Sequence, residues 1–458
     1  MRILLLLCFL VSPIHLLAKE RMNIIFILAD DLGYGDLGCY GQKQIKTPHL
    51  DTFAKQGLRL TQGYAGSTVC APSRCTVMTG LHTGHCKIRG NADQSLNNKD
   101  LTLATVLHRA GYATACVGKW GLGDPGTPGV PSKHGFDYFY GYLNQKHAHN
   151  YYPDHLWTSG KGEEPRKVPF DNVVVNGVST NKATYSVDSI TANAVKFIED
   201  NKDKPFFLYY TPTLPHANNE ARNKGMEIPS PGIYGDKDWP EAQKNHAAMI
   251  SRLDSDVGLM LKKLDDLKLS DNTVVFFSSD NGPHKEGGAD PAFFNSSGPL
   301  QGYKRALTEG GIRVPTMVRG PGIPSGTSDV IFTFWDLFPT ACSIAGIDCP
   351  KNLDGVTVWK DLQTNKATQN DRALYWEFHE RGSKQAIRQG KWKAIKAVNQ
   401  PLQLFDLSTD LHEDNDLSKQ QPELVARFTK MMQEMRTDVP EWQLKATPPA
   451  KKKNPAKK

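Results

Sequence analysis

Four apolar runs separated by helix-like segments most constrain the fold of this chain. The runs span residues 23–28, 112–117, 205–210 and 273–277. Each is apolar at consecutive rather than alternate positions, which is typical of strands buried on both faces of a parallel sheet. The segments between them with apolar residues at helical spacing span 101–110, 186–199 and 245–267. Alternating strands and helices predict a doubly wound α/β domain.

Polar side chains follow each of these runs. They are Asp30 and Asp31, then Lys119, then His216, and finally Asp280 and Asn281. Ligands in open α/β sheets bind beyond the carboxyl ends of the strands, so we expect these groups to meet at one edge. Asp and Asn are also the commonest turn residues, and either pair alone would indicate only a turn. Four strands that deliver carboxylate, amide, amine and imidazole to one edge favour a functional site.

The donor types at that edge indicate a hard cation. Asp30, Asp31, Asp280 and Asn281 offer only oxygen, the ligand that Ca²⁺ and Mg²⁺ prefer, whereas zinc sites generally include His or Cys. The sequence therefore predicts a calcium site, with Mg²⁺ as the alternative.

The segment CAPSRCTVMTG, residues 70–80, carries the most specific signal. Pro72 suits the first turn of a helix and Gly80 suits its end. Cys70 would then lie at a helix N-terminus, where the dipole and free amides favour an anion. The alternative is a helix that merely begins near a proline.

This segment resembles the signature of the type I sulfatases of the alkaline phosphatase superfamily, whose first cysteine is oxidised to formylglycine (3-oxoalanine). Five further segments resemble motifs of that family: NIIFILADDLGYGDLGCYG, GKWGLG, TPTLPH, SSDNGPH and GYKRALTEGGIRVP. The resemblance covers nearly the whole chain after its first residues and extends to bacterial carbohydrate sulfatases and arylsulfatases. It implies an alkaline-phosphatase-like fold, in which helices sandwich a large mixed, mostly parallel sheet.

The resemblance also implies roles for individual residues. Formylglycine at position 70 would attack the sulfate sulfur and stand among the metal ligands, after a sulfatase-maturing enzyme has oxidised Cys70. Arg74, Lys119 and Lys304 would contact sulfate oxygens and offset negative charge. His216 is the candidate acid for the departing alcohol, and Lys304 would share that task.

One position departs from the family pattern. Many relatives read GKWHLG, but this chain has Gly121 in place of that histidine. His147 and His149 in the segment NQKHAHNYYPDHLW are candidates to fill the space. That segment and WEFHERG resemble those of sulfatases acting on sulfated sugars, so we expect His149, His379 and Arg381 to bind a sulfated carbohydrate. For His379 and Arg381, a surface strand with alternating polar residues is an equally good interpretation.

The C-terminal part has a different pattern. Short strand-like runs (ALYWEF, KQAIRQ, KWKAIKA and LQLFDL) precede a helical segment at 422–436, which predicts a small antiparallel sheet with one packing helix. The predicted division is a signal peptide at 1–18, a catalytic domain at 19–365, a C-terminal subdomain at 366–446 and a disordered tail at 447–458.

The first 18 residues have the layout of a cleavable export signal. Arg2 precedes an apolar run at 3–11, which is shorter than the roughly 20 residues of a spanning helix. We therefore expect no stable membrane anchor and a periplasmic or secreted protein, or a lysosomal or extracellular one if the source is eukaryotic.

Seven cysteines follow this segment, so disulfides are possible but one thiol must stay unpaired.

Charge and composition exclude other classes. The formal net charge is +7, but five of the lysines lie in 451–458, so the rest of the chain does not have the excess positive charge that favours binding of nucleic acid.

The motifs together predict a sulfuric ester hydrolase. The alternatives are a phosphodiesterase or phosphonate hydrolase of the same superfamily, or an inactive binder of sulfated glycans in which Cys70 is never oxidised.

Overall fold

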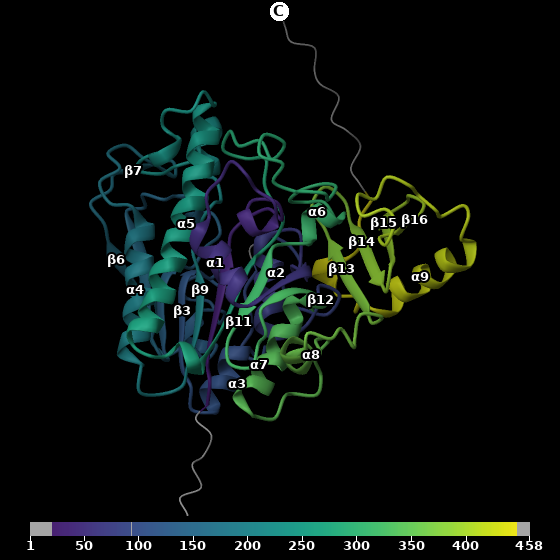
Figure 1. Ribbon diagram of the computed structural model, residues 1–458, viewed down its shortest axis with the longest axis horizontal. Coiled ribbons are helices and arrows are strands. Elements are labelled where there is room, and N and C mark those ends of the chain that lie inside the picture. The colour runs from purple at the N-terminus through teal and green to yellow at the C-terminus, as the bar shows by residue number, and fades with distance from the viewer. Residues whose placement is uncertain (1–20, 93, 447–458) are drawn as a thin grey trace, which may run out of the picture.

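The computed structural model describes residues 21–92 and 94–446. The predicted signal peptide and the predicted tail at 447–458 lie outside these residues. A ten-stranded sheet runs through the larger part of the molecule, and a small sheet lies at one end of its long axis (Figure 1). The strand order in the large sheet is β12-β2-β11-β10-β1-β9-β3-β4-β5-β6.

The strands of the large sheet are β1 (Asn23–Ala29), β2 (Leu58–Tyr64), β3 (Ala113–Lys119), β4 (Tyr138–Tyr142), β5 (His155–Gly160), β6 (Arg166–Pro169), β9 (Phe206–Thr211), β10 (Thr273–Ser279), β11 (Thr316–Arg319) and β12 (Gly326–Thr333). β10, β1, β9, β3 and β4 are parallel neighbours, as are β12 and β2. The remaining neighbours pair antiparallel. The sheet is therefore mixed and mostly parallel, as predicted. A separate two-stranded ribbon joins β7 (Val174–Val175) to β8 (Val178–Ser179).

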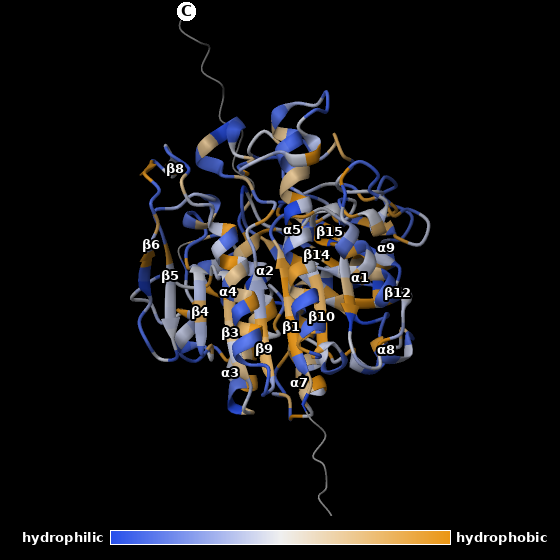
Figure 2. Cartoon of the chain, turned by 60° about the vertical axis from the view of Figure 1, so that its left-hand side comes forward, coloured by the Kyte–Doolittle hydropathy of each residue, from blue (hydrophilic) through white to orange (hydrophobic). Residues whose placement is uncertain are grey.

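Helices cover both faces of this sheet because its central strands are apolar on both sides. Ile25 and Ile27 of β1 pack into one core, and Ile24 and Phe26 pack into the other. Figure 2 shows β1, β9 and β10 as the most hydrophobic strands, enclosed by helices with hydrophilic outer surfaces. The first core holds α1 (Pro48–Gln56), α4 (Ser186–Asp200) and α5 (Glu241–Asp266). The second holds α2 (Cys70–Thr79), α3 (Leu103–Arg109), α7 (Leu337–Ala345) and α8 (Trp359–Thr364).

The four predicted strands correspond to β1, β3, β9 and β10, and the three predicted helices to α3, α4 and α5, with ends shifted by a few residues. The outer strands were not predicted. β11 has only four residues, and β2 alternates buried with half-buried positions, so neither shows the continuous apolar run of a central strand. Their place in the sheet depends on pairing with distant segments.

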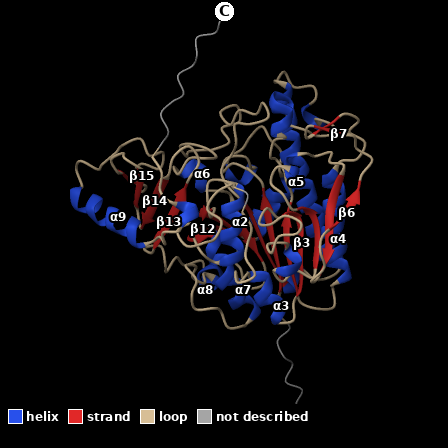
Figure 3. Cartoon of the chain, turned by 180° about the vertical axis from the view of Figure 1, so that it is seen from behind, coloured by secondary structure: helices blue, strands red, loops and turns tan. Residues whose placement is uncertain are grey.

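The C-terminal prediction is confirmed in its architecture. β13 (Ala373–Phe378), β14 (Lys384–Gln389), β15 (Trp392–Ala397) and β16 (Gln403–Asp406) form one antiparallel sheet in that order. The helix α9 (Pro422–Glu434) packs against it through Phe428 and Met432 (Figure 3).

A buried charge cluster joins the two sheets. Lys393 of β15 is fully buried and its Nζ lies 2.8 Å from Glu309 Oε1 and 2.9 Å from Glu413 Oε1. Glu309 begins the short helix α6 (Glu309–Ile312) beside the large sheet and also pairs with Arg313. Burial alone would raise the pKa of Glu309, but the charges of Lys393 and Arg313 hold it at about 2. The carboxylate is therefore ionised and depends on these cations.

Lys393→Met is expected to lower the free energy of unfolding by about 3–5 kcal/mol, because it leaves buried Glu413 without its cation and Glu309 with Arg313 in place of two charged partners. Urea denaturation measures this change. Lys391→Met is the matched control, since the Lys391 side chain is 52% exposed and pairs with Asp406 at the surface, where such pairs contribute about 0–1 kcal/mol. Equal losses in the two variants would show that the cluster contributes no more than a surface pair.

The cysteines and helices also bear on the predicted compartment. All seven cysteines in the described residues have free thiols, so none of the possible disulfides is formed among them. Within the same residues, no helix has the length and apolar character needed to span a membrane.

Candidate active site

Cys70 is the first residue of α2, as the sequence predicts. All ten residues of this helix are buried, with Pro72 in the first turn. Gly80 ends the helix with φ of +68°, a left-handed conformation that glycine adopts without strain. The Sγ atom of Cys70 lies 3.5 Å from Asp30 Oδ1. The helix thus presents Cys70 to the carboxyl end of β1.

The parallel pairing of β1 with β10 brings the carboxylates together. Ala29 and Ser279 are register partners, so the residues that follow each strand meet at the same edge. The amide N–H of Asp31 donates to Asp280 Oδ1 at 3.1 Å, and Asn281 Nδ2 donates to Asp31 Oδ1 at 2.6 Å. The predicted oxygen donors therefore form one buried cluster.

Two buried cations neutralise this cluster from the Cys70 side. Arg74 lies one helical turn after Cys70, and its Nη2 and Nε lie 2.8 and 3.1 Å from Asp280 Oδ2. Lys119, the last residue of β3, places its Nζ 2.7 Å from Asp30 Oδ2. The carbonyl oxygen of Lys119 also accepts a hydrogen bond from Arg74 Nη1 at 2.6 Å. Since all these side chains are buried, the pairs are protected from solvent screening.

Lys304 and His216 approach the cluster from the other side. Lys304 Nζ lies 2.7 Å from Asp31 Oδ2, 3.1 Å from Glu286 Oε2 and 3.0 Å from His216 Nε2. His216 Nδ1 lies 2.7 Å from the carbonyl oxygen of Ala217. A carbonyl only accepts, so Nδ1 carries the imidazole proton and Nε2 accepts from Lys304.

The pKa directions agree with this proton arrangement. Burial and the positive charge of Lys304 hold the pKa of His216 well below its usual range, so its ring is neutral at rest. Burial would raise the pKa of Asp30, but the charges of Lys119 and Arg74 hold it well below its usual range. Burial and the charge of Asp30 raise the pKa of Asp280. The positive side chains around Asp280 therefore do not fully offset the negative charge of the cluster.

The cluster fits a hard divalent cation. Asn281 Oδ1 is buried and has no hydrogen-bond partner among the described residues, although its Nδ2 has two acceptors. An unpaired buried carbonyl beside three carboxylates is costly unless a cation meets it. Asp30, Asp31, Cys70 and His216 also place potential ligand atoms within 4.8 Å of one another.

A cavity of about 360 Å³ opens in front of these groups. Cys70, His216 and Lys304 lie in its wall. Side-chain amides make up much of the remaining lining: Asn91, Gln94, Asn144, Gln145 and Asn219. Arg305 and Glu380 also line it and are joined by a 2.9 Å ion pair. Such a polar wall suits a ligand with many hydroxyl groups.

The structure brings only some of the predicted substrate residues to this cavity. His149 lines it, with its ring stacked on His216 at 4.8 Å. His379 and Arg381 are not among the lining residues that the structure describes. His379 Nε2 lies 3.0 Å from Glu377 Oε1, and Arg381 is exposed on a turn with φ of +58°. Contact of either with substrate would lie outside this cavity and stays a prediction.

The sequence analysis did not predict three charged residues at or near the cavity. They are Glu380, which lies between His379 and Arg381 in the chain, together with Arg305 and Glu286. The motif GYKRALTEGG offered the signal for Arg305, which directly follows Lys304. Only the folded chain shows that Arg305 Nη1 lies 2.6 Å from Glu286 Oε1 and so joins Lys304 to the rim of the cavity.

Gln145 occupies the space beside Gly121. A Cβ atom at Gly121 would lie 1.9 Å from Gln145 Nε2, and Gly121 has φ of +75°. Gln145 Oε1 is buried without a hydrogen-bond partner among the described residues. Of the two histidines considered for this space, His149 stacks on His216, and His147 packs on Tyr142 instead.

Gly121→Ala is expected to lower stability by about 1–2 kcal/mol through the left-handed backbone, and further by displacing Gln145. In a Gln145→Ala background only the backbone part should remain. A double-mutant cycle on thermal unfolding should therefore show coupling of about 0.5 kcal/mol or more. Strictly additive losses would mean that Gln145 does not fill this space.

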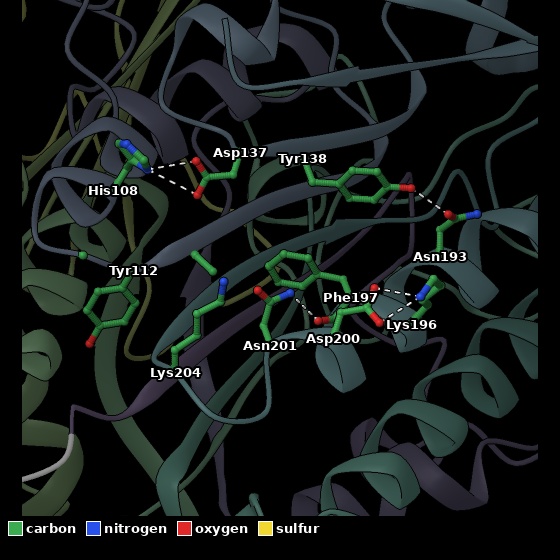
Figure 4. Close-up of a pocket in the computed structure, with 12 residues that line it drawn as sticks. His108, Tyr112, Asp137, Tyr138, Asn193, Lys196, Phe197, Asp200, Asn201 and Lys204 are labelled. Carbon is green, nitrogen blue, oxygen red and sulfur yellow. Dashed lines mark hydrogen bonds and ion pairs between the residues drawn. The ribbon is translucent and has the colours of Figure 1, made fainter. Parts of the chain in front are cut away.

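A larger cavity, of about 540 Å³, lies near the start of β3 and thus away from Lys119 at its other end. Figure 4 shows that many of its polar side chains bind one another. Tyr138 donates to Asn193, and Lys196 pairs with Asp200. This cavity holds no group of the charged cluster, so it is not the candidate active site.

The mostly parallel sheet, with a helix-terminal cysteine, carboxylates and cations at one strand edge, defines a hydrolase of alkaline-phosphatase-like fold. The sulfatase family model matches residues 22–347, and that of the N-sulphoglucosamine sulphohydrolase C-terminal region matches 302–438. The chain therefore belongs to the sulfatase family and is a sulfuric ester hydrolase.

Its relatives include carbohydrate sulfatases and arylsulfatases. The chain is 30% identical to N-acetylgalactosamine-6-O-sulfatase of Bacteroides thetaiotaomicron, over 92% of this chain and 94% of that protein. It is 32% identical to arylsulfatase A of Bos taurus, over 90% of this chain and 82% of that protein. The crystal structure of Ps i-CgsB in complex with k-i-k-neocarrahexaose superposes with a TM-score of 0.78 and 29% identity, covering 91% of this chain and 92% of that one.

Proposed function

We propose that this sulfatase hydrolyses sulfate esters of a sulfated polysaccharide or glycosaminoglycan, using formylglycine made from Cys70 and a calcium ion, with Mg²⁺ as the alternative. The observation that carries the proposal is the position of Cys70, at a buried helix N-terminus and 3.5 Å from Asp30. Burial raises the pKa of the Cys70 thiol well above its usual range. An unmodified thiol here is therefore protonated and a poor nucleophile.

The modified residue and the cation supply different chemistry. A hydrated aldehyde at position 70 would supply one hydroxyl for attack on sulfur and a second whose deprotonation would later expel sulfate and restore the aldehyde, whereas a serine would retain a stable sulfate ester. A cation held by Asp30, Asp31, Asp280 and Asn281, with the residue at position 70, would offset negative charge on the sulfate oxygens.

The surrounding side chains orient and neutralise the sulfate group. Arg74 fixes Asp280 through two hydrogen bonds, which holds that carboxylate in place beside Asp31. Lys119 and Lys304 carry buried positive charges on opposite sides of the cluster. Preorganised cations of this kind stabilise charge that grows in the transition state without reorganising.

The Lys304–His216 pair holds the proton for the leaving alcohol. Lys304 donates to His216 Nε2 at rest, as it does to Asp31 and Glu286, so the proton shared by the pair lies on Lys304. Delivery to the alcohol oxygen comes directly from Lys304, or through His216 once Nε2 has taken up that proton.

His216→Ala is expected to slow hydrolysis of a sugar sulfate by on the order of 10²–10⁴-fold, the usual contribution of general acid catalysis. An activated aryl sulfate should lose much less, because its phenolate leaves without a proton. The ratio of kcat/KM values for the two substrates measures this difference. Equal loss on both substrates would reassign His216 to sulfate binding or structure.

The substrate class rests on two observations. Five side-chain amides line the cavity, and they supply paired donors and acceptors for sugar hydroxyls. The relative from Bacteroides thetaiotaomicron is named for a sulfated amino sugar, and Ps i-CgsB was solved with a carrageenan-type hexasaccharide. His149, at the cavity wall, is the candidate contact to the sugar.

Two measurements test the proposal. The mass of the Cys70 peptide from active enzyme should show the aldehyde in place of the thiol, and sulfate esters should be turned over far faster than phosphate mono- and diesters. Faster turnover of phosphate esters would favour the phosphodiesterase or phosphonate hydrolase alternative. An unmodified Cys70 with binding but no turnover of sulfated sugars would favour the glycan-binder alternative.

We further propose that residues 19–365 form the catalytic domain and 366–446 a subdomain that closes the cavity through Glu380. A cleaved export signal at 1–18 would put the mature protein in the periplasm or outside the cell, or in the lysosome or outside the cell of a eukaryotic source. A sulfatase-maturing enzyme that oxidises Cys70 is the partner that this proposal requires.

A further inference from the structure

Three potential metal ligands lie together outside the active site. One ligand atom from each of His147, Asp154 and His155 lies within 4.8 Å of the other two. The two imidazole rings are 4.6 Å apart between centroids, and His155 Nδ1 lies 2.7 Å from Asp154 Oδ1. Ligands of tetrahedral zinc are about 3.4 Å apart for bonds of about 2.1 Å, so small side-chain shifts would bring these atoms into place.

One ring nitrogen of His147 has no partner in the part of the chain that the structure describes. Its Nε2 atom is buried and finds no hydrogen-bond partner among the described residues. Burial, the neighbouring His155 and Lys167 lower the pKa of His147 to about 4. The ring is therefore neutral near pH 7, as a metal ligand must be.

A second cluster of similar composition lacks this property. In the set His82, His85 and Asp354, His82 Nδ1 accepts from the amide of Gly84 at 3.1 Å. His85 Nδ1 pairs with Asp354, and Asp354 Oδ2 also accepts from the amide of His82. These polar atoms are satisfied by the fold, so this cluster carries no proposal.

We propose that His147, Asp154 and His155 form a zinc site, with the fourth position open to water. Two imidazoles and one carboxylate match the donor preference of Zn²⁺, in contrast to the oxygen-rich cluster at Asp30. The Asp154 side chain is 57% exposed, which gives the ion a path from solvent.

The site would fasten a loop that serves the active site. His147 lies in the connection between β4 and β5, and His155 is the first residue of β5. The same connection carries Gln145 and His149 to the cavity wall. A zinc ion would therefore cross-link the loop to the sheet beside the substrate cavity.

The test is titration of the full-length, Ca²⁺-saturated enzyme with ZnCl₂ by calorimetry, and with CoCl₂ to follow the visible absorption of tetrahedral Co²⁺. We expect one tight site per chain and an increase in Tm on adding Zn²⁺. Asp154→Asn alters only an exposed carboxylate and should still fold. It and His147→Ala should each lower zinc affinity by at least about 10-fold, as changes in a metal shell do.

His85→Gln is the matched control, because it alters the other histidine cluster, and it should bind zinc as the wild type does. Unchanged zinc affinity in Asp154→Asn would overturn the proposal. Loss of the tight site in His85→Gln alone would move it to His82 and Asp354 and would equally refute this assignment. These readouts do not use turnover, so they do not depend on the proposed reaction.

Discussion

Cys70→Ala is expected to lower sulfate ester hydrolysis by on the order of 10⁴-fold or more, the loss seen when a covalent nucleophile is removed. Cys70 is the first residue of α2 and is buried beside Asp30 and Lys119. The remaining wall of the cavity would still bind substrate but would offer no atom to attack sulfur. Release of sulfate from a sulfated oligosaccharide measures the effect.

Cys75→Ala is the matched control. Cys75 lies in the same helix and is equally buried, but it packs in the apolar core on one face of the sheet. It should lose some stability and keep turnover per folded molecule. Cys70→Ser, made in a host without serine-type maturation, should be as inactive as Cys70→Ala. Full activity with an unmodified thiol at position 70 would contradict the formylglycine mechanism.

Removal of the metal is expected to abolish turnover, and Ca²⁺ should restore it. Three buried carboxylates meet at the ends of β1 and β10, and burial together with Asp30 raises the pKa of Asp280. The cluster therefore gains from a cation that the side chains alone do not supply. Activity after exhaustive chelation, followed by titration with Ca²⁺ and Mg²⁺, measures the dependence.

The Asn281→Ala variant tests the metal site without removing a charged side chain from the ion pairs of the protein. This change removes a neutral side chain whose Oδ1 is unpaired among the described residues, so it leaves the pairing of Arg74 with Asp280 in place. It should weaken Ca²⁺ binding by at least about 10-fold, as measured by calorimetry. Asp354→Asn, distant in the chain from the cluster, should leave Ca²⁺ affinity unchanged. Retained turnover in metal-free enzyme would refute the calcium role.

The central strands could be predicted from the sequence because helices cover both faces of the sheet and so bury every residue of these strands. β1, β3, β9 and β10 show this as continuous apolar runs. The outer strands could not be predicted in this way, since incomplete burial and pairing with distant partners leave only a weak local pattern. β2, for example, pairs with β11 and β12, more than 200 residues later.

The same distinction holds at the active site. The sequence by itself determined the chemistry at the strand ends, because a residue that ends or follows a buried parallel strand lies at the ligand edge. Asp30, Asp280 and Lys119 are placed by this rule. It also determined the start of α2 at Cys70, through the local effects of Pro72 and Gly80.

Only the tertiary structure decided which loop side chains complete the cavity. Gln145 rather than a histidine fills the space beside Gly121, and Glu380 rather than His379 reaches the cavity. The proton of the Lys304–His216 pair was likewise placed by the carbonyl of Ala217. Loop conformation and tautomer depend on contacts between segments distant in the chain, so neither periodicity nor spacing along the sequence encodes them.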